Sequence, residues 1–274
     1  MDDLVSRWSL TDQVPVGGGS INQAFAARTA EGERVFLKTH PHPPPGFFAA
    51  EAAGLQALAR AGAPVPEVLD VVDSGLLLSH IETGSAGPRS MEALGEVLAA
   101  LHEQHGPHFG FEADNYCGLS VQHNAAHDNG HDFFINCRLL PQGQRAFDEG
   151  LLTRPWMQAL ERLCSQLGDL IPQQPPSLIH GDLWSGNVLF DAQRQPVLID
   201  PAVSWSWAEA DLAMTRLFGG FGPELDAAYQ SIRRLDPGLE ERIPLYNLYH
   251  LLNHLNLFGG GYQAAVTRVL QPWR

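Results

Sequence analysis

One short segment constrains this chain more than any other, because it carries polar groups at a fixed spacing. Residues 180–187 read His-Gly-Asp-Leu-Trp-Ser-Gly-Asn, so Asp182 and Asn187 are five positions apart. An apolar stretch then ends at Asp200. Phosphoryl transfer from a nucleotide needs one carboxylate facing the acceptor hydroxyl, and an amide oxygen and a second carboxylate for the metal ions. The segment therefore predicts a catalytic base at Asp182 and metal ligands at Asn187 and Asp200.

The alternative interpretation of this segment is a turn that only caps a helix. Taken together with Asn187 and Asp200, however, the spacing HxDxxxxN matches the kinase catalytic loop, and Asp200 matches the metal-binding position that follows it. Magnesium prefers hard oxygen donors and keeps several waters, so one amide, one carboxylate and the nucleotide phosphates suffice. The cofactors that this pattern predicts are ATP and Mg²⁺.

A second group of residues, early in the chain, is expected to bind the nucleotide. Lys38 ends a predicted strand, and Glu51 lies in the helix predicted to follow it. Pairing with Glu51 would fix the lysine against the phosphates, as in kinases. The alternative is an ordinary strand-edge lysine and an exposed helix charge, but Glu51 lies one turn before Leu55 on an apolar face, which favours pairing. Backbone amides of a glycine-rich loop would also approach phosphate oxygens, namely those of Gly18, Gly19 and Ser20.

The order of the predicted elements indicates an α+β fold with two lobes. Strands are expected within 13–28, 34–38 and 68–81, with a helix over 47–60. Beyond a connector at 83–88 the chain is mostly helical, apart from short strands around 188–199; the expected helices are 90–104, 131–149, 155–170, 209–217, 223–234 and 244–257. This is the protein-kinase-like arrangement. We expect a nucleotide-binding lobe over residues 1–82 and a catalytic and substrate lobe over 83–274.

Composition excludes several classes of function. The 274 residues carry a formal charge of −14, which argues against a nucleic-acid partner. No apolar run is long enough to span a membrane, and the N-terminus has no basic start or apolar core of a secretory signal. The cysteines at 117, 137 and 164 are odd in number and widely spaced, so they fit neither a disulfide framework nor a zinc site. A cytoplasmic location is expected. The sequence leaves the oligomeric state open, and a monomer is compatible with it.

Two groups of histidines invite a metal-site interpretation that the sequence does not favour. The spacing of His102, His105 and His108 straddles the Gly-Pro pair that follows a predicted helix. Three more histidines recur every four residues within 123–132, but Asn-Gly at 129–130 interrupts the helix that would align them. We expect this second stretch to be a solvated or substrate-side loop.

The chain resembles the fructosamine kinase (ketosamine-3-kinase) family, which is related to the aminoglycoside phosphotransferases. The catalytic-loop segment at 180–187 and the Ile-Asp-Pro-Ala block at 199–202 are the most distinctive motifs, because aminoglycoside and choline kinases share the HxDxxxxN frame but usually lack that tryptophan and proline. Further similar motifs lie at 17–22, 36–38, 50–55, 109–111, 209–214, 218–220, 251–254 and 257–259. The resemblance thus covers nearly the whole chain.

The resemblance implies an ATP-dependent enzyme that phosphorylates the 3-hydroxyl of a ketosamine, such as a fructosamine or ribulosamine adduct, as a step of deglycation repair. The acceptor would be a small-molecule ketosamine or a glycated protein amine. Trp184 would lie beside the sugar, and Asp211 would brace the catalytic loop by accepting hydrogen bonds from its backbone. The hinge that holds the adenine would comprise Ser79, His80 and Ile81. The stretch 123–132 departs from the family pattern, which leaves the identity of the ketosamine open.

Two alternatives remain beside this interpretation. One is a kinase for another small hydroxylated acceptor, such as an aminoglycoside, choline or a sugar. The other is a nucleotide-binding pseudokinase that acts as an interaction module. A degenerate site would normally have lost a catalytic group, whereas this chain keeps all five, namely Lys38, Glu51, Asp182, Asn187 and Asp200.

Overall fold

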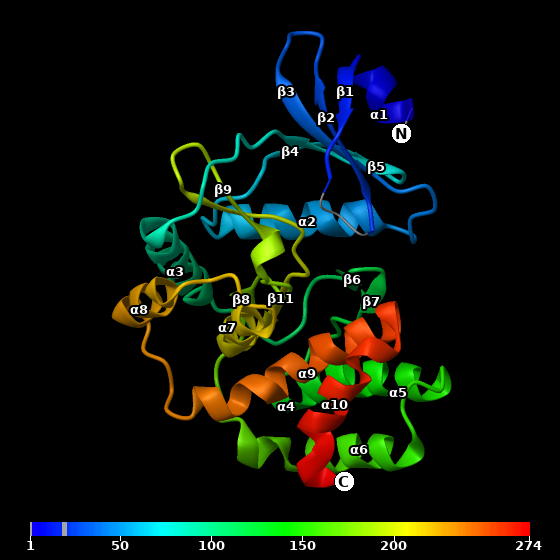
Figure 1. Ribbon diagram of the computed structural model, residues 1–274, viewed down its shortest axis with the longest axis vertical. Coiled ribbons are helices and arrows are strands. Elements are labelled where there is room, and N and C mark those ends of the chain that lie inside the picture. The colour runs from blue at the N-terminus through cyan, green and yellow to red at the C-terminus, as the bar shows by residue number, and fades with distance from the viewer. Residues whose placement is uncertain (1, 18–20) are drawn as a thin grey trace.

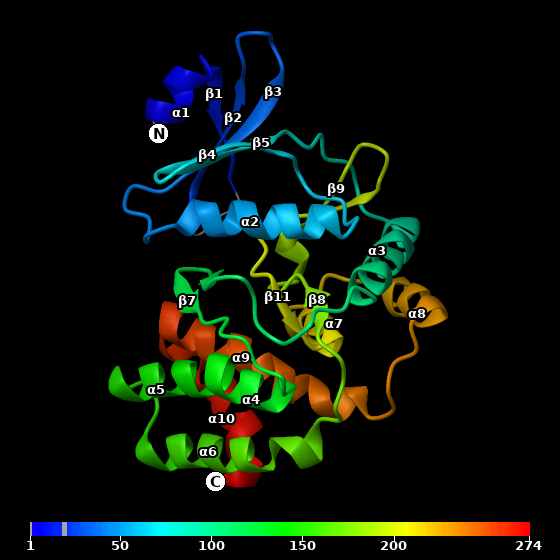
Figure 2. The same ribbon diagram turned by 180° about the vertical axis from the view of Figure 1, so that it is seen from behind.

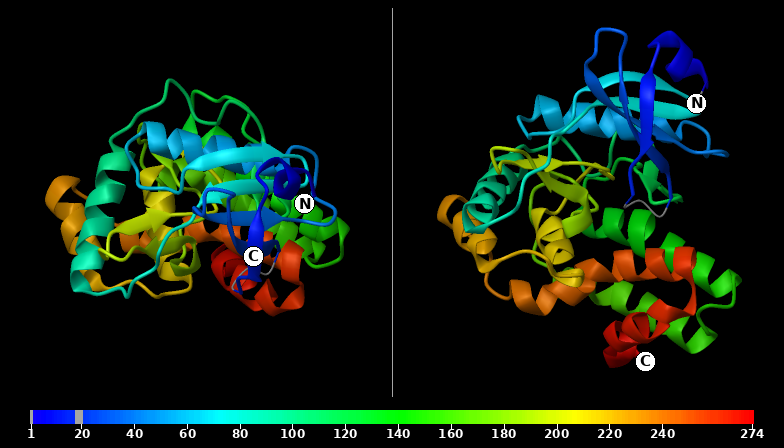
Figure 3. Two further views of the ribbon diagram at one scale, coloured as in Figure 1. Left: turned by 90° about the horizontal axis from the view of Figure 1, so that it is seen from above. Right: turned by 45° about the horizontal axis from the view of Figure 1, so that its top comes forward.

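A five-stranded sheet lies at one end of the molecule and most of the helices lie at the other (Figure 1). This computed structural model describes residues 2–17 and 21–274. The described residues nearest the N-terminus and those nearest the C-terminus lie at opposite ends of the molecule (Figure 3, right). The α+β fold predicted from the order of the elements is confirmed. We propose that the boundary between the two lobes lies between residues 82 and 83.

The N-terminal sheet has the strand order β1-β2-β3-β5-β4, with every neighbouring pair antiparallel. Its strands are β1 (Thr11–Pro15), β2 (Gln23–Arg28), β3 (Arg34–Thr39), β4 (Val68–Val72) and β5 (Gly75–Ser79). Alternation along β3 sends Val35 and Leu37 to the face covered by helix α1 (Asp2–Arg7). Phe36 packs on the opposite face. Lys38, two residues on, therefore points to that second face.

Helix α2 (Phe47–Arg60) covers this second face, and Figures 1 and 2 show it between the sheet and the rest of the molecule. Its bounds are those predicted. Phe48, Leu55 and Leu58 are fully buried on one side of it, as their near-helical spacing requires. The chain leaves the helix through Gly62 in the left-handed conformation, at φ +84°, which favours glycine.

The C-terminal part consists mainly of helices, with three short two-stranded ribbons. They are α3 (Pro88–His102), α4 (Gly130–Phe134), α5 (Leu140–Asp148), α6 (Arg154–Leu170), α7 (Ala208–Leu217), α8 (Pro223–Ile232), α9 (Leu239–Phe258) and α10 (Gln263–Leu270). Two-stranded ribbons join β6 (Asn115–Cys117) to β7 (Ser120–Gln122), β8 (Ser177–Ile179) to β11 (Ser204–Ser206), and β9 (Val188–Phe190) to β10 (Pro196–Leu198). No described helix combines the length and apolar character needed to cross a membrane.

Several predicted elements differ from the observed ones. The helix expected over 131–149 is divided by a π-helical turn at Ile135–Leu139, and α9 begins five residues before Pro244, the expected start. Proline is common at a helix start, which explains the second error. Four three-residue strands (β6, β7, β8 and β11) were not predicted, because so short a segment shows no periodicity. Helices α1 and α10 were missed as well.

The prediction of a solvated loop over 123–132 is wrong at its C-terminal end. Asn129 accepts a hydrogen bond from the backbone N–H of His131 and so starts helix α4 rather than interrupting one. The His131 ring is buried and lies 2.8 Å from the carbonyl oxygen of Ile171 through its Nε2. The rest of the stretch fits the expectation better: residues 123–129 lie in no helix or strand, and His123 is exposed and paired with Asp114.

Helices α7 and α9 are joined by a buried ion pair. The Arg242 guanidinium donates to both carboxylate oxygens of Glu209, at 2.6 and 2.8 Å, and Tyr246 donates its hydroxyl to the same carboxylate at 2.8 Å. Only 7% of the Arg242 side chain and 5% of the Glu209 side chain are exposed. Removing one member of such a pair leaves the other charge buried without its partner.

We expect Arg242→Met to lower the free energy of unfolding by about 3–5 kcal/mol, because the Glu209 carboxylate loses its cation. The matched control is Arg145→Met on α5, which breaks an exposed pair with Glu149 just beyond the helix and should cost less than about 1 kcal/mol. Urea denaturation followed by tryptophan fluorescence measures both. Equal losses in the two variants would contradict the structural role given to the buried pair.

Candidate active site

The segment that follows β8 turns sharply, and a glycine makes the turn possible. Gly181 has φ +84°, in the left-handed region that glycine tolerates. A Cβ at this position would lie 2.0 Å from the carbonyl oxygen of Ala202. Residue 181 must therefore be glycine on two independent grounds, its backbone conformation and its close approach to the neighbouring chain.

The carboxylate of Asp211, near the start of α7, fixes the backbone of this turn. It accepts hydrogen bonds from the backbone N–H groups of His180 at 2.7 Å and Gly181 at 2.9 Å. The Nε2 of His102 lies 3.3 Å from the same carboxylate. Burial by itself would raise the pKa of Asp211, but these partners outweigh burial and lower the pKa. The bracing role that the resemblance implied for Asp211 is confirmed.

The His180 ring joins the catalytic loop to the strand that leads to Asp200. Its Nδ1 accepts the backbone N–H of Asp182 at 3.2 Å, so its Nε2 carries the proton and donates to the carbonyl oxygen of Ile199 at 2.9 Å. Burial lowers the pKa of His180 and keeps the ring neutral. The imidazole therefore serves as a fixed link between two parts of the site.

Asp182 follows this turn and is held by the amide of Asn187. The Nδ2 of Asn187 donates to the backbone carbonyl of Asp182 at 2.8 Å and to its Oδ2 at 3.0 Å. The other oxygen, Oδ1, faces His250 on α9, 3.8 Å from its Nδ1. A fifth of the Asp182 side chain is exposed. Because Oδ2 is already engaged, Oδ1 is the oxygen that can meet a hydroxyl group.

The charge of Asp182 is poorly compensated within the protein. Burial raises its pKa to about 7, the Asn187 hydrogen bond opposes this, and the negative charges of Asp200 and Asp211 add to the increase. A site with this much negative potential favours a bound cation.

Lys38 supplies the cation that the structure places closest to Asp200. Its Nζ lies 2.7 Å from Oε1 of Glu51 and 2.8 Å from Oδ1 of Asp200. Burial lowers the pKa of Lys38, but the charges and hydrogen bonds of the two carboxylates outweigh burial and raise it. The ion pair expected between Lys38 and Glu51 is present, and Lys38 also links the N-terminal sheet to the C-terminal part.

Asn187 and Asp200 are adjacent because of the β9–β10 ribbon. Val188 pairs with Leu198, and the N–H of Ile199 donates to the carbonyl oxygen of Asn187 at 3.0 Å. The Nδ2 of Asn187 is used on Asp182, so its side-chain oxygen is free to face a metal. One oxygen of Asp200 contacts Lys38, which leaves the other for the same purpose. An amide oxygen and a carboxylate next to uncompensated negative charge fit a hard divalent cation such as Mg²⁺.

The remaining nucleotide-binding predictions concern backbone groups. Ser79 ends β5, and its hydroxyl oxygen accepts the backbone N–H of Glu67 at 2.9 Å. The ring of His80 lies 3.1 Å from the guanidinium of Arg34, and burial, followed by that charge, lowers its pKa. Ile81 is partly exposed. The Ser79 hydroxyl oxygen is thus engaged within the protein. Gly18, Gly19 and Ser20 lie outside the described residues.

Trp184 follows Asp182 by two residues, and its ring belongs to an aromatic cluster. Its side chain is 37% exposed and packs over Gly186, where a Cβ would lie 2.2 Å from the ring. Phe218 meets it edge-on, with the ring centroids 6.3 Å apart, and His254 on α9 lies 5.2 Å from Phe218. Phe218 and His254 were within motifs quoted for the resemblance, but nothing in their spacing assigned them to the site.

The family model described as "Fructosamine kinase" matches residues 2–273. A curated relative, the "Probable ketoamine kinase" of Enterococcus faecium, is 42% identical over 266 residues, which cover 94% of this chain and 94% of the relative. A solved structure of a "putative fructosamine-3-kinase" from Thermobifida fusca superposes with a TM-score of 0.92 at 32% identity. That match covers 100% of this chain and 99% of the other.

More distant structures share the fold alone. The ADP-bound aminoglycoside phosphotransferase APH(2'')-Ib has a TM-score of 0.65 at 15% identity, over 98% of this chain and 95% of its own. This likeness confirms the protein-kinase-like arrangement predicted from the order of strands and helices.

We expect Gly181→Ala to abolish phosphoryl transfer and to destabilise the protein, because the new Cβ would collide with the backbone of Ala202. The matched control is Gly150→Ala, where φ is +74° but no atom lies within 4 Å of the new Cβ. That control should cost only the left-handed backbone penalty of about 1–2 kcal/mol and leave turnover unchanged. Steady-state kinetics and thermal unfolding measure both effects. An active Gly181→Ala variant would show that the turn geometry is not required.

Proposed function

This chain belongs to the fructosamine kinase family, and from that premise we propose that it transfers the terminal phosphoryl group of ATP to the 3-hydroxyl of a ketosamine. The proposal is supported by two sets of contacts: the amide of Asn187 holds Asp182, and Lys38 pairs with both Glu51 and Asp200. These are the groups that phosphoryl transfer requires. The contacts among these five residues also argue against the alternative that the protein is a pseudokinase.

Asp182 would orient the acceptor and accept its proton. With Oδ2 held by Asn187, the free Oδ1 would accept a hydrogen bond from the 3-hydroxyl and take its proton as the bond to phosphorus forms. In a loose transition state the attacking oxygen carries little charge, so orientation contributes more than basicity. A pKa near 7 still allows the carboxylate form at neutral pH.

Lys38 would bind the phosphates of ATP, with Glu51 holding the ammonium in place. Asn187 and Asp200 would hold Mg²⁺, which when bound supplies the positive charge that neutralises the phosphates. The backbone of Gly18, Gly19 and Ser20 would cover the phosphates, and the segment formed by Ser79, His80 and Ile81 would hold the adenine.

The acceptor would lie against the exposed face of Trp184. A sugar ring or its open-chain form packs well on an indole face, and its hydroxyls would then reach Asp182. The amine of a ketosamine is cationic when protonated, so the negative potential around Asp182 and Asp200 favours it. The same chemistry would allow a free ketosamine or a glycated amine on a protein surface. With a net charge of −14 and three buried free cysteines, we propose a cytoplasmic setting without a nucleic-acid partner.

Phosphorus NMR of the purified protein with ATP, Mg²⁺ and a soluble fructosamine tests the reaction. We expect a new sugar 3-phosphate resonance with fructosamine, ribulosamine or erythrulosamine, and none with an aminoglycoside or choline. The reason is that an acceptor must place its hydroxyl at Asp182 while its ring lies on Trp184. Phosphorylation of an aminoglycoside or choline alone would overturn the assigned acceptor while keeping the kinase assignment.

Asp182→Asn should keep ATP binding and lower turnover by at least about 10²–10⁴-fold, because the amide cannot accept the hydroxyl proton. Asp169→Asn, at an exposed position on α6, is the matched control and should keep full activity. Calorimetric titration with ATP, alongside the kinetic assay, separates binding from transfer. If Asp182→Asn retained most of its turnover, the catalytic base would have to be another group.

A further inference from the structure

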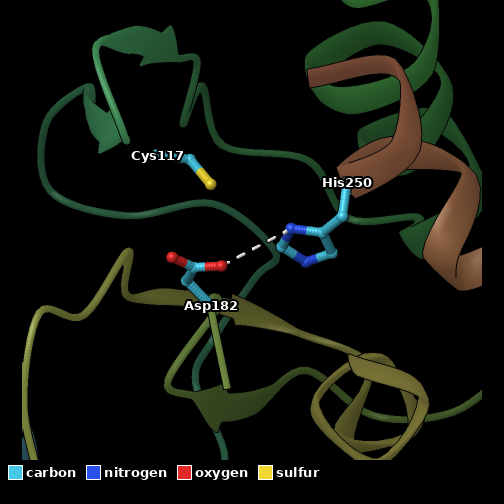
Figure 4. Close-up of side chains that lie close together, drawn as sticks. All are labelled: Cys117, Asp182 and His250. Carbon is cyan, nitrogen blue, oxygen red and sulfur yellow. Dashed lines mark ion pairs between the residues drawn. The ribbon is translucent and has the colours of Figure 1, made fainter. Parts of the chain in front are cut away.

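Three side chains with metal-binding atoms meet at the acceptor side of Asp182 (Figure 4). Cys117 comes from the end of β6, Asp182 from the catalytic loop and His250 from α9. One sulfur, one carboxylate oxygen and one ring nitrogen of these residues all lie within 4.8 Å of one another. In Figure 4 the Cys117 sulfur and the His250 ring both point toward the carboxylate. No function assigned above uses Cys117 or His250.

The His250 ring presents an unsatisfied nitrogen to this cluster. Its side chain is 7% exposed, and within the described residues its buried Nδ1 has no hydrogen-bond partner. The Oδ1 atom of Asp182, 3.8 Å away, is too distant for a hydrogen bond. Burial lowers the pKa of His250 to about 3, so the ring is neutral and offers a lone pair. A buried polar nitrogen without a partner is uncommon and commonly marks the place of a water or an ion.

Cys117 is held by contacts with two residues of helix α9. Its carbonyl oxygen accepts from Asn253 at 3.1 Å, and its thiol is a free, buried group beside the Tyr249 hydroxyl. Burial, together with the charge of Asp182, raises the pKa of Cys117 well above its usual value. The thiol therefore stays protonated until a cation arrives. The Arg138 guanidinium also acts on it, but Arg138 is engaged with Asn124 and the carbonyl oxygen of His123.

We propose that Cys117, Asp182 and His250 form an inhibitory site for a thiophilic divalent cation such as Zn²⁺. Sulfur, nitrogen and oxygen donors together select zinc over magnesium, which prefers oxygen alone. Binding releases the Cys117 proton to solvent, and the thiolate and carboxylate then neutralise the two positive charges of the ion. Three protein ligands leave a fourth, open position for water, as in other zinc sites with three protein ligands.

The cluster needs only a small contraction to reach zinc geometry. Zinc binds thiolate sulfur at about 2.3 Å and imidazole nitrogen or carboxylate oxygen at about 2.0–2.2 Å, so its ligands lie roughly 3.3–3.8 Å apart. Separations within 4.8 Å can close by movements on the order of 1 Å, which side-chain rotations supply.

A metal ion at this site would bind Oδ1 of Asp182, the oxygen proposed to accept a hydrogen bond from the acceptor hydroxyl. The carboxylate oxygen taken by zinc could not then orient the 3-hydroxyl, so zinc would compete with the acceptor rather than with ATP. This inhibitory effect rests on the proposed function, since it assumes Asp182 is the catalytic base. The binding of the metal does not rest on it, and the two can be tested separately.

Absorption spectroscopy with Co²⁺ as the probe tests binding. We expect a thiolate-to-cobalt charge-transfer band in the wild-type protein and in Cys164→Ser, whose cysteine lies on α6 away from the cluster. The band should vanish in Cys117→Ser, and His250→Gln should bind Co²⁺ at least about tenfold more weakly. Circular dichroism checks that each variant folds. A band that persists in Cys117→Ser, or no band in the wild type, would overturn the site whether or not the protein proves to be a kinase.

Kinetics with Zn²⁺ in the presence of Mg²⁺ and ATP tests the inhibition. We expect zinc to raise the KM for the ketosamine with little change in kcat, and we expect Cys117→Ser to keep zinc-free turnover while needing at least about tenfold more zinc for half-inhibition. Equal half-inhibition in Cys117→Ser, Cys164→Ser and the wild type would mean that zinc acts through the nucleotide, and the inhibitory role would be wrong.

Discussion

Three carboxylates act on one another in this site, and the protein compensates each in a different way. Asp211 receives two backbone N–H groups and the His102 ring, and its pKa is lowered despite burial. Asp200 is paired with the ammonium of Lys38. Among the described residues, the side chain of Asp182 receives the amide of Asn187 as its one hydrogen-bond donor, and its pKa is raised to about 7. The unequal compensation separates a structural carboxylate from the carboxylates available for chemistry.

This inequality determines what the site can bind. The backbone N–H groups of His180 and Gly181 are covalently fixed parts of the catalytic loop, so their bonds to Asp211 stabilise the conformation of its turn. Asp182 keeps an oxygen without a strong donor, so a cation from outside the protein gains the most by binding near it. The three proposed ligands, namely the nucleotide with its metal, a cationic amine and a thiophilic ion, would each bring positive charge to the same region of negative potential. These ligands would differ in the protein donor atoms that they contact.

The parts of the site that sequence predicted are those encoded within one segment or by one periodicity. The positions of Asp182 and Asn187 follow from a contiguous motif, and the pairing of Lys38 with Glu51 follows from a strand face and a helix face that must pack together. The catalytic and binding roles of these residues, and of the glycine-rich loop that lies outside the described residues, remain predictions. Cys117, His250 and Phe218 were not predicted, because only the tertiary fold brings β6, α9 and the end of α7 to the catalytic loop.

The two oxygens of Asp182 separate a hard donor set from a soft one. Oδ2 accepts from the amide nitrogen of Asn187, and the hard donors proposed for Mg²⁺ are the oxygen of that amide and the Asp200 carboxylate. Oδ1 faces a ring nitrogen and lies near a sulfur. The hard set belongs to the 180–200 segment, and under the proposed function a change in it would impair transfer. The soft set comes from β6 and α9, outside that segment, so replacing Cys117 would change metal sensitivity and leave the catalytic groups in place. Sensitivity to thiophilic metals is therefore separable from catalysis in this fold.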